Sequence, residues 1–324
     1  MAFFYLWRHS RPGDWLLSAS FPRLFCFLLG RPLLRQHLKC LYEVHDLAWL
    51  NNGRLTARAE QELAMLARTH GLLTTTQALA GLIARLVPGK PVRVLPLGCG
   101  FEPDAFPRAR SPATGSQARY VLGYVGSLHR EQGVHWLVRA WSSVRYRQQV
   151  PLRLEVVGGI RRDAQQLRSV AAAVGVAEEV TVRDALDPDC LAPWLQGVDA
   201  LIIPALPEGR MPYVAITKAY DYLGLRRPIL ASDLPTIREV IRPDREGLLF
   251  RAGDDASLAC VVDQLARQPA LGPALAEAAA ESAHDFSWDN RARRYWRWLD
   301  EAGTPPPTPV RMPGRDPERS APAA

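Results

Sequence analysis

The feature that most constrains the fold is an alternation of short apolar runs and amphipathic segments that begins at Tyr120. The run "YVLGYVG" ends in glycine, and "VHWLVRAWSSV" follows it with apolar residues at helical spacing. The pattern repeats in "LRLEVVGG" and "AQQLRSVAAAVG", and again in "ALIIPAL" and the helix before "PILAS". Strands and helices that alternate in this way are typical of βαβ units around a parallel sheet buried on both faces. The sequence therefore predicts a Rossmann-like domain over residues 120–283.

Residues 1–105 show a shorter version of the same alternation. It predicts strands at "KCLYEVHDL", "GLLTTT" and "VRVLPLG", and helices at "RLTARAEQELAMLART" and "QALAGLIARLV". A complete doubly wound domain has about six strands, so three strands indicate an incomplete domain. The expected fold class is α/β, with two Rossmann-like domains that face a cleft and an incomplete N-terminal one.

The remaining segments are a linker, a helix and a tail. Residues 106–119 are rich in Pro, Ser and Gly, as a linker is. The segment "FSWDNRARRYWRWL" predicts a helix within residues 284–302 that braces the domains, with one packing stripe formed by Trp288, Ala292, Tyr295, Trp296 and Leu299. Residues 303–324 have the composition of a disordered tail.

Charge and composition limit the classes of binding partner that can be expected. The formal net charge is +7, and the first 40 residues carry six Lys or Arg side chains against Asp14 alone. Such a basic face is most often a solvated surface, although peripheral contact with an anionic membrane stays open. No nucleic-acid recognition motif accompanies the charge, so no nucleic-acid partner is expected. The apolar stretch 15–34 is interrupted by Pro and Arg and does not predict a membrane span.

The cysteine and histidine positions predict neither disulfides nor a metal site. The five cysteines are scattered without CxxC spacing, and the seven histidines are equally dispersed. We therefore expect free thiols, a cytoplasmic location and no metal or other cofactor.

Two glycine-containing turns follow predicted strands at the edge of the sheet where ligands gather. In "GYVGSLHREQGV", Gly126 could admit a phosphate that His129 or Arg130 neutralises, and "VVGGIRR" offers a second such place at Gly158 with Arg161 nearby. Glycine serves purely steric purposes in such turns about as often.

A stronger signal is the stretch "TKAYDYLGLRRPILAS", which holds Lys218 and Asp221 three residues apart on a predicted helix. As a surface ion pair the two side chains would contribute only a few tenths of a kcal/mol. The alternative is that they face a ligand, because buried strands precede and follow them. Glu208, in the loop "IIPALPEGR", lies at the same edge of the predicted sheet.

In order and spacing, the segments from Tyr120 to about Leu299 resemble the donor domain of retaining glycosyltransferases of family 4, which have the GT-B fold. The resemblance is carried by "YVLGYVGSL", "LRLEVVGG", "VDALIIPALPEG", "KAYDYLGLRRPILAS", "IREVIRPDREGLLFRAGDDASLA" and "FSW". In the first half, "YEVHDL" looks like the segment that carries the active-site histidine of the acceptor domain. Residues 3–34 look like the helix before that strand, so the resemblance implies an N-terminally shortened acceptor domain.

The resemblance implies a role for each candidate residue. His45 and Glu208 would contact the transferred sugar. Asp221 would bind the nucleotide ribose. The diphosphate would lie against Gly126 and Arg130, and Lys218 would bind either the diphosphate or Asp221. The other donor-binding candidates are Ser127, Gly158 and Arg161. The helix that begins near Thr217 would point its positive end at the same phosphates.

The chain departs from the family pattern at charged positions. Ser127 and Gln132 stand where the family usually has a basic residue and a lysine, so Lys218, Arg130, Arg161 or Arg162 would have to supply the positive charge. The family's pair of glutamates is replaced by Tyr213 and Asp221.

The function expected from the resemblance is metal-independent transfer of a sugar, with retention of configuration, as in glycan biosynthesis. The donor would be a nucleotide-sugar co-substrate, and the acceptor a glycan, a lipid-linked molecule or a small molecule. The alternative is a catalytically inactive relative that binds a sugar nucleotide or a partner protein, because fold similarity does not guarantee function.

Overall fold

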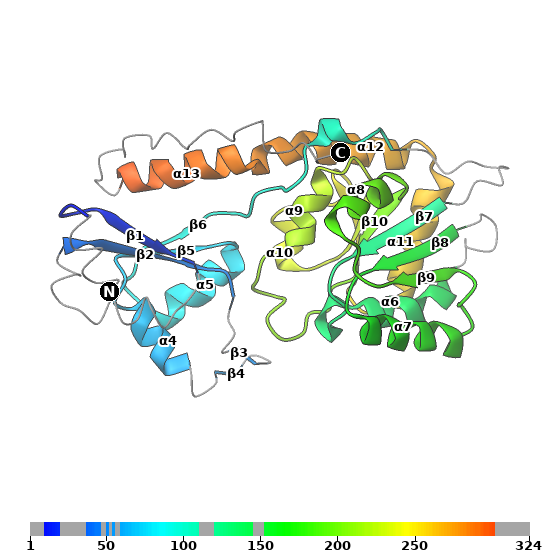
Figure 1. Ribbon diagram of the computed structural model, residues 1–324, viewed down its shortest axis with the longest axis horizontal. Coiled ribbons are helices and arrows are strands. Elements are labelled where there is room, and N and C mark those ends of the chain that lie inside the picture. Colours follow the sequence, from blue (N-terminus) through cyan, green and yellow to red (C-terminus); the bar gives the residue numbers. More distant parts are fainter. Residues whose placement is uncertain are drawn as a thin grey trace, which may run out of the picture.

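The computed structural model describes residues 10–19, 37–46, 50–51, 54–55, 59–109, 120–144 and 152–301. They form two parallel sheets with helices on their faces (Figure 1). The first sheet has the order β1-β2-β5-β6, with β1 (Trp15–Ser18), β2 (Lys39–Val44), β5 (Gly71–Thr74) and β6 (Val92–Val94). Leu50–Asn51 (β3) and Arg54–Leu55 (β4) form a separate antiparallel pair.

The second sheet has the order β12-β11-β10-β7-β8-β9, and every pairing in it is parallel. Its strands are β7 (Tyr120–Val125), β8 (Leu152–Val157), β9 (Val180–Arg183), β10 (Ala200–Ile203), β11 (Ile229–Ser232) and β12 (Gly247–Phe250). The described helices are α4 (Ala59–Leu66), α5 (Gln77–Leu86), α6 (Val134–Ala140), α7 (Arg161–Ala173), α8 (Pro188–Gln196), α9 (Thr217–Leu223), α10 (Pro235–Arg238), α11 (Asp255–Arg267), α12 (Leu271–Ala283) and α13 (Trp288–Glu301). Single 3-10 turns are η1 (Pro103–Ala105), η2 (Arg130–Gln132), η3 (Trp141–Ser143) and η5 (His284–Phe286).

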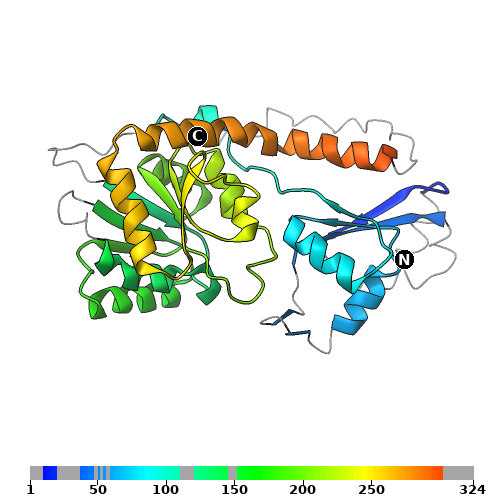
Figure 2. The ribbon, with the colours of Figure 1, turned by 180° about the vertical axis from the view of Figure 1, so that it is seen from behind.

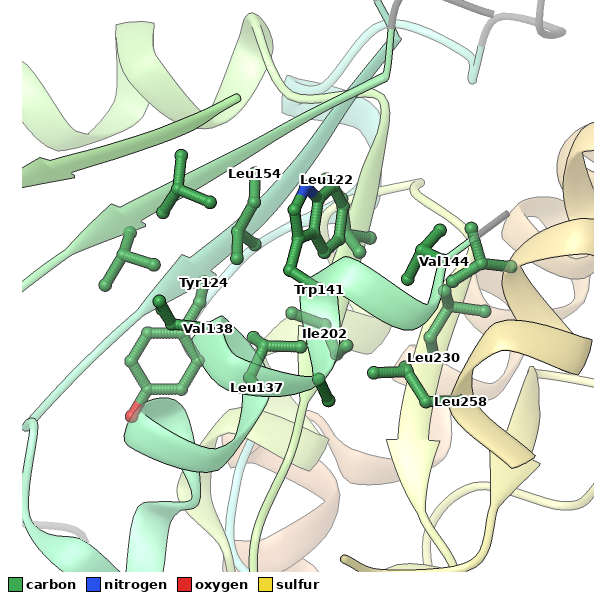
Figure 3. Close-up of a cluster of buried hydrophobic side chains, with 14 of the residues drawn as sticks. Leu122, Tyr124, Leu137, Val138, Trp141, Val144, Leu154, Ile202, Leu230 and Leu258 are labelled. Atoms are coloured by element: carbon green, nitrogen blue, oxygen red, sulfur yellow. The ribbon is translucent and has the colours of Figure 1, made fainter. Parts of the chain in front are cut away.

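Alternate residues of the strands supply the cores on the two faces of the second sheet. In β7, Leu122 and Tyr124 pack with Trp141 on the face that α6, α7 and α11 cover (Figure 3). Val121 and Val125 belong to the opposite face, under α8, α9 and α10. This two-residue period explains why the strands appear as continuous apolar runs in the sequence.

The first sheet has a strand that the sequence did not predict. Trp15–Ser18 pairs in parallel with β2, so the interpretation of residues 3–34 as a helix is wrong for this segment. The turn at Gly13, whose N–H donates to the carbonyl of His37, brings the chain to the sheet edge, where Trp15 packs against Trp298. Residues 3–9 and 20–34 lie outside the described part of the chain. The helix predicted from Arg54 begins only at Ala59, because Arg54 and Leu55 belong to β4.

Helix α13 returns from the second domain and lies along the first sheet (Figure 2). Leu299 is buried with Leu41, Leu73 and Leu95, and Tyr295 and Trp298 pack beside them. The predicted stripe is wrong for Trp296, which is 43% exposed, because it lies about 100° around the helix from Tyr295. Trp288 is also exposed, at 56%.

Candidate functional site

A cavity of about 360 Å³ lies between the two domains. Strands β2 and β5 of the first sheet end at it, and so do the turn after β7 and the loop after β10. Its lining consists of His45, Asp46, Thr75, Leu97, Ser127, Gln132, Arg210, Met211, Val214, Ala215, Ile216, Thr217 and Lys218. Ligands of open α/β sheets bind at the carboxyl ends of parallel strands, and this cavity is at that position in both sheets.

Lys218 is a half-buried charged residue that the second domain contributes to this cavity. Its Nζ donates to Oε1 of Gln132 at 2.7 Å and lies 5.2 Å from the centroid of the Tyr124 ring. Burial lowers the pKa of Lys218 from 10.5 to about 8, and the nearby charge of Asp221 opposes the shift. Lys218 therefore lines the cavity and is held there by Gln132, which also belongs to the lining.

Asp221, one turn further along α9, points elsewhere. Its Oδ1 accepts a hydrogen bond from the N–H of Gly100 at 2.9 Å, at the segment that joins the domains. Burial raises the pKa of Asp221, against the Gly100 hydrogen bond and the charge of Lys218. Asp221 does not line the cavity, so the two residues do not act as one ion pair at the same place.

The two predicted glycine turns pack against each other. Gly126 has φ +145°, and a side chain there would meet Nζ of Lys218 at 2.9 Å and the Tyr124 hydroxyl at 3.3 Å. Gly158 also has φ +145°, and a Cβ on it would collide with the Gly126 carbonyl. Gly158 therefore permits the close approach of the two turns, while Gly126 leaves room beside the Lys218 ammonium group.

His45 reaches the cavity from the first domain and is held by a buried carboxylate. Its Nε2 lies 3.0 Å from Oε1 of Glu43, which is 4% exposed. Arg291 of α13 also pairs with Glu43 and donates to the carbonyl of Pro96 at 2.9 Å. Burial alone would raise the pKa of Glu43, but the His45 hydrogen bond and the Arg291 charge outweigh it and lower that pKa. Glu43 is therefore an ionised anchor for His45.

Glu208 and Arg130 bind each other at the surface. Arg130 Nε lies 3.0 Å from Oε2 of Glu208, and the two side chains are 85% and 40% exposed. Arg161 is an exposed residue at the start of α7. None of the three lines the cavity. Of the predicted site residues, the structure brings His45, Ser127 and Lys218 together in the lining, with Gly126 directly behind Lys218.

The cavity also contains residues that the sequence did not single out. Arg210 pairs with Asp46 across the two domains, and both line the cavity. Asp46 directly follows His45 in the sequence, and Arg210 is the last residue of the loop "IIPALPEGR" that contains Glu208. Thr75, at the end of β5, carries no motif around it that could have identified it.

Further contacts hold the domains together beside the cavity. The side chain of Tyr213 packs against the apolar cluster of the first domain, and its carbonyl accepts from Oγ1 of Thr76 at 2.5 Å. The carboxylate of Glu239 accepts from the N–H groups of Gln77 at 2.8 Å and Ala78 at 3.2 Å, at the start of α5. Tyr213 therefore serves the interface between the domains.

No group of three or more His, Cys, Asp or Glu side chains among the described residues is placed to hold a metal ion. No helix in the described ranges is long and apolar enough to cross a membrane.

Most of the chain is similar in sequence or in structure to known proteins. Residues 119–268 match the family model described as glycosyl transferases group 1. The D-inositol 3-phosphate glycosyltransferase of Streptomyces scabiei is 25% identical over 311 residues, which cover 88% of this chain and 68% of the relative. The enzyme of the same name from Acidothermus cellulolyticus is 26% identical over 308 residues, covering 88% of this chain and 65% of the relative.

The similar solved structures confirm the two-domain α/β arrangement. A glycosyltransferase from Rickettsia africae has a TM-score of 0.70 at 14% identity, covering 89% of this chain and 76% of its own. Anabaena HepE in complex with UDP has a TM-score of 0.70 at 15% identity, covering 89% and 79%. At such identities the likeness shows the fold alone.

Proposed function

We propose that this chain, a member of the group 1 glycosyltransferases with the GT-B fold, moves a sugar from a nucleotide-sugar donor to a hydroxyl group of an acceptor. The observation that carries the proposal is the half-buried Lys218, whose ammonium group lines a cavity that His45 enters from the other domain. A diphosphate needs a positioned positive charge, and the acceptor must approach from the opposite wall. The cavity has a positive charge at Lys218 and an opposite wall, formed by the first domain at His45, from which an acceptor can approach.

For the donor we assign the diphosphate to Lys218, Ser127 and the open backbone at Gly126. An ammonium group in a water-poor site stabilises a charge that develops on a leaving group far more than it would in water. Helix α9 has seven residues, so we assign the main positive charge to Lys218 and not to the helix dipole. Anabaena HepE was solved with UDP and with UDP-glucose, which supports a nucleoside diphosphate sugar as the donor class.

For the chemistry we propose displacement on one face of the sugar, which retains its configuration. The bond between the anomeric carbon and the diphosphate breaks, the acceptor oxygen bonds to the same carbon, and its proton passes to a departing phosphate oxygen. Lys218 neutralises the phosphate as this charge forms, which requires no metal ion. His45, oriented by Glu43, is assigned to a hydroxyl of the transferred sugar. Asp221 remains the proposed ribose contact through Oδ2.

The test measures donor binding and turnover with one matched pair of variants. Wild type is expected to show a rise in melting temperature with UDP and to release UDP from UDP-glucose in the presence of an acceptor. Lys218→Met is expected to lose both responses. Lys90→Met is the control, because Lys90 donates to the carbonyl of Thr69 in the first domain and does not line the cavity.

The first acceptors to test are chosen from the substrate that appears in the relatives' names, D-inositol 3-phosphate. D-inositol 3-phosphate, myo-inositol and glycerol are the first polyols to test with UDP-glucose and with other UDP-sugars. Turnover with none of them, together with an unchanged melting temperature in UDP, would contradict the proposed function.

The second candidate function is nucleotide-sugar binding without transfer, and Tyr213 is the observation that favours it. This residue stands at the position of a family glutamate and packs into the first domain instead of lining the cavity. A UDP-dependent thermal shift that Lys218→Met abolishes, without sugar transfer across the donor and acceptor panel, would support this candidate.

A further inference from the structure

Three consecutive threonines, Thr74, Thr75 and Thr76, close the end of strand β5. Each is at most 1% exposed. Thr74 Oγ1 donates to the carbonyl of Thr76 at 3.2 Å. Thr76 Oγ1 donates to the carbonyl of Tyr213 and accepts from the N–H of Leu79 at 3.0 Å, which caps helix α5. Within the described residues, the Oγ1 of Thr75 is buried without a hydrogen-bond partner.

Thr75 lies at the wall where an acceptor would bind. Strands β2 and β5 are neighbours in parallel, with Val44 opposite Thr74. His45 and Thr75 are the first residues after these two strands. They therefore lie side by side at the carboxyl edge of the first sheet, and both line the cavity. Of the three threonines, only the one whose hydroxyl lacks a partner belongs to the lining.

A buried hydroxyl without a partner destabilises a folded chain, because it has lost its hydrogen bonds to water and gained none. The cavity is the adjacent space from which a partner can come. A threonine hydroxyl donates one hydrogen bond and accepts others, so it suits a ligand group that also does both. Alcohol groups of a polyol or a sugar have this property.

We infer that Thr75 is an acceptor-binding residue whose hydroxyl hydrogen-bonds an alcohol group of a polyol or sugar acceptor beside His45. The inference rests on the proposed function and adds a residue and a ligand class to it. The contact fixes the acceptor against the first domain while the donor occupies the Lys218 side of the cavity. Orienting two reactants in this way is a main source of rate in a transfer between bound molecules.

The experiment compares Thr75→Val, Thr75→Ser and Thr76→Val with wild type in the full chain. Valine has the shape of threonine without its hydroxyl. Because the Thr75 hydroxyl has no partner to lose, Thr75→Val is expected to melt at the wild-type temperature or above it. Thr76→Val loses a helix cap and is expected to melt lower. The thermal shift caused by UDP is expected to be the same in Thr75→Val and wild type.

Transfer kinetics then separate the role in acceptor binding from a structural role. With UDP-glucose saturating and myo-inositol, glycerol or D-inositol 3-phosphate varied, Thr75→Val is expected to raise the KM for the acceptor by about 3- to 10-fold, the effect of one lost hydrogen bond. Thr75→Ser, which keeps the hydroxyl, is expected to restore most of the affinity. The KM for UDP-glucose is expected to stay within about twofold.

The outcomes distinguish the inference from the function on which it rests. A wild type that transfers sugar and a Thr75→Val variant with an unchanged acceptor KM would overturn the inference alone. A Thr75→Val variant that melts as low as Thr76→Val would also overturn it, because the hydroxyl would then have a partner in the free protein. A wild type that transfers to no acceptor overturns the proposed function, and the inference with it.

Discussion

Replacing Lys218 with methionine is expected to stabilise the free protein while it removes donor binding. The substitution keeps an apolar stem near the Tyr124 ring and removes an ammonium group whose pKa burial lowers from 10.5 to about 8. A shift of this size means that the charge costs the folded state roughly 3 kcal/mol at neutral pH. The lost hydrogen bond to Gln132 offsets about 1 kcal/mol of that gain. We therefore expect Lys218→Met to raise the free energy of unfolding by about 2 kcal/mol at pH 7.

The same shift determines how the difference depends on pH. The folded-state pKa of Lys218 lies below the unfolded value, so between about pH 8 and 10.5 the unfolded chain holds a proton that the folded chain has released. The contribution of this residue to wild-type stability is lowest below pH 8 and rises with pH through that window. The advantage of Lys218→Met is expected to be full at pH 7 and to disappear towards pH 10.5.

Urea unfolding, followed by tryptophan fluorescence at pH 7, 8, 9 and 10, measures both effects. Lys90→Met is the matched control and is expected to show no stabilisation, because its ammonium group donates to the backbone carbonyl of Thr69 and does not line the cavity. The reasoning is refuted if Lys218→Met is less stable than wild type at pH 7. It also fails if the difference between the two proteins does not shrink as the pH rises.

Three further outcomes are expected. Gly126→Ala is expected to lower the free energy of unfolding by about 1–3 kcal/mol, because alanine is strained at φ +145° and meets Lys218. The same variant is expected to lose the rise in melting temperature caused by UDP. If calorimetry shows an unchanged rise with UDP, the diphosphate has been placed wrongly. Glu43→Gln is expected to destabilise the chain by about 2–4 kcal/mol in urea unfolding, because it leaves Arg291 without its buried carboxylate. The pKa of Glu43 is lowered, so its contribution is present above the unfolded value of 4.5 and is lost as the pH falls below it, which a comparison of the two proteins from pH 3 to 6 checks. A double-mutant cycle of Asp46→Asn and Arg210→Met is expected to give a coupling energy under about 1 kcal/mol, since both side chains are about 40% exposed; a larger value would mean a desolvated pair.

Much of the fold could be predicted because its signal is local. In the sequence of the second domain, each strand is an apolar run and each helix has apolar residues repeating every 3.6 positions. The alternation of the two patterns predicts the parallel sheet. Strand β1 gave no such signal, because four residues at a sheet edge with one exposed side chain cannot be told from part of a longer apolar segment. Its identity depends on pairing with β2, across more than 20 residues of sequence.

The candidate site could be predicted where a residue's role depends on its own strand or helix. Lys218 is such a residue, because the strands around α9 place it at the sheet edge. Glu43 and Arg291 could not be paired in advance, since they are 248 positions apart and meet only when α13 crosses the first sheet. Thr75 could not be distinguished from Thr74, because the sequence does not show which hydroxyl lacks a partner.

The route of α13 has a consequence for how the site comes into being. Arg291 near the end of the described chain secures Glu43, which in turn orients His45, so the geometry of the cleft depends on a helix that is synthesised after both sheets. During synthesis, the strands of both domains can be complete before Arg291 is available to pair with Glu43. The histidine side of the cleft therefore acquires its final arrangement only after α13 has been synthesised, later than the strands of both sheets.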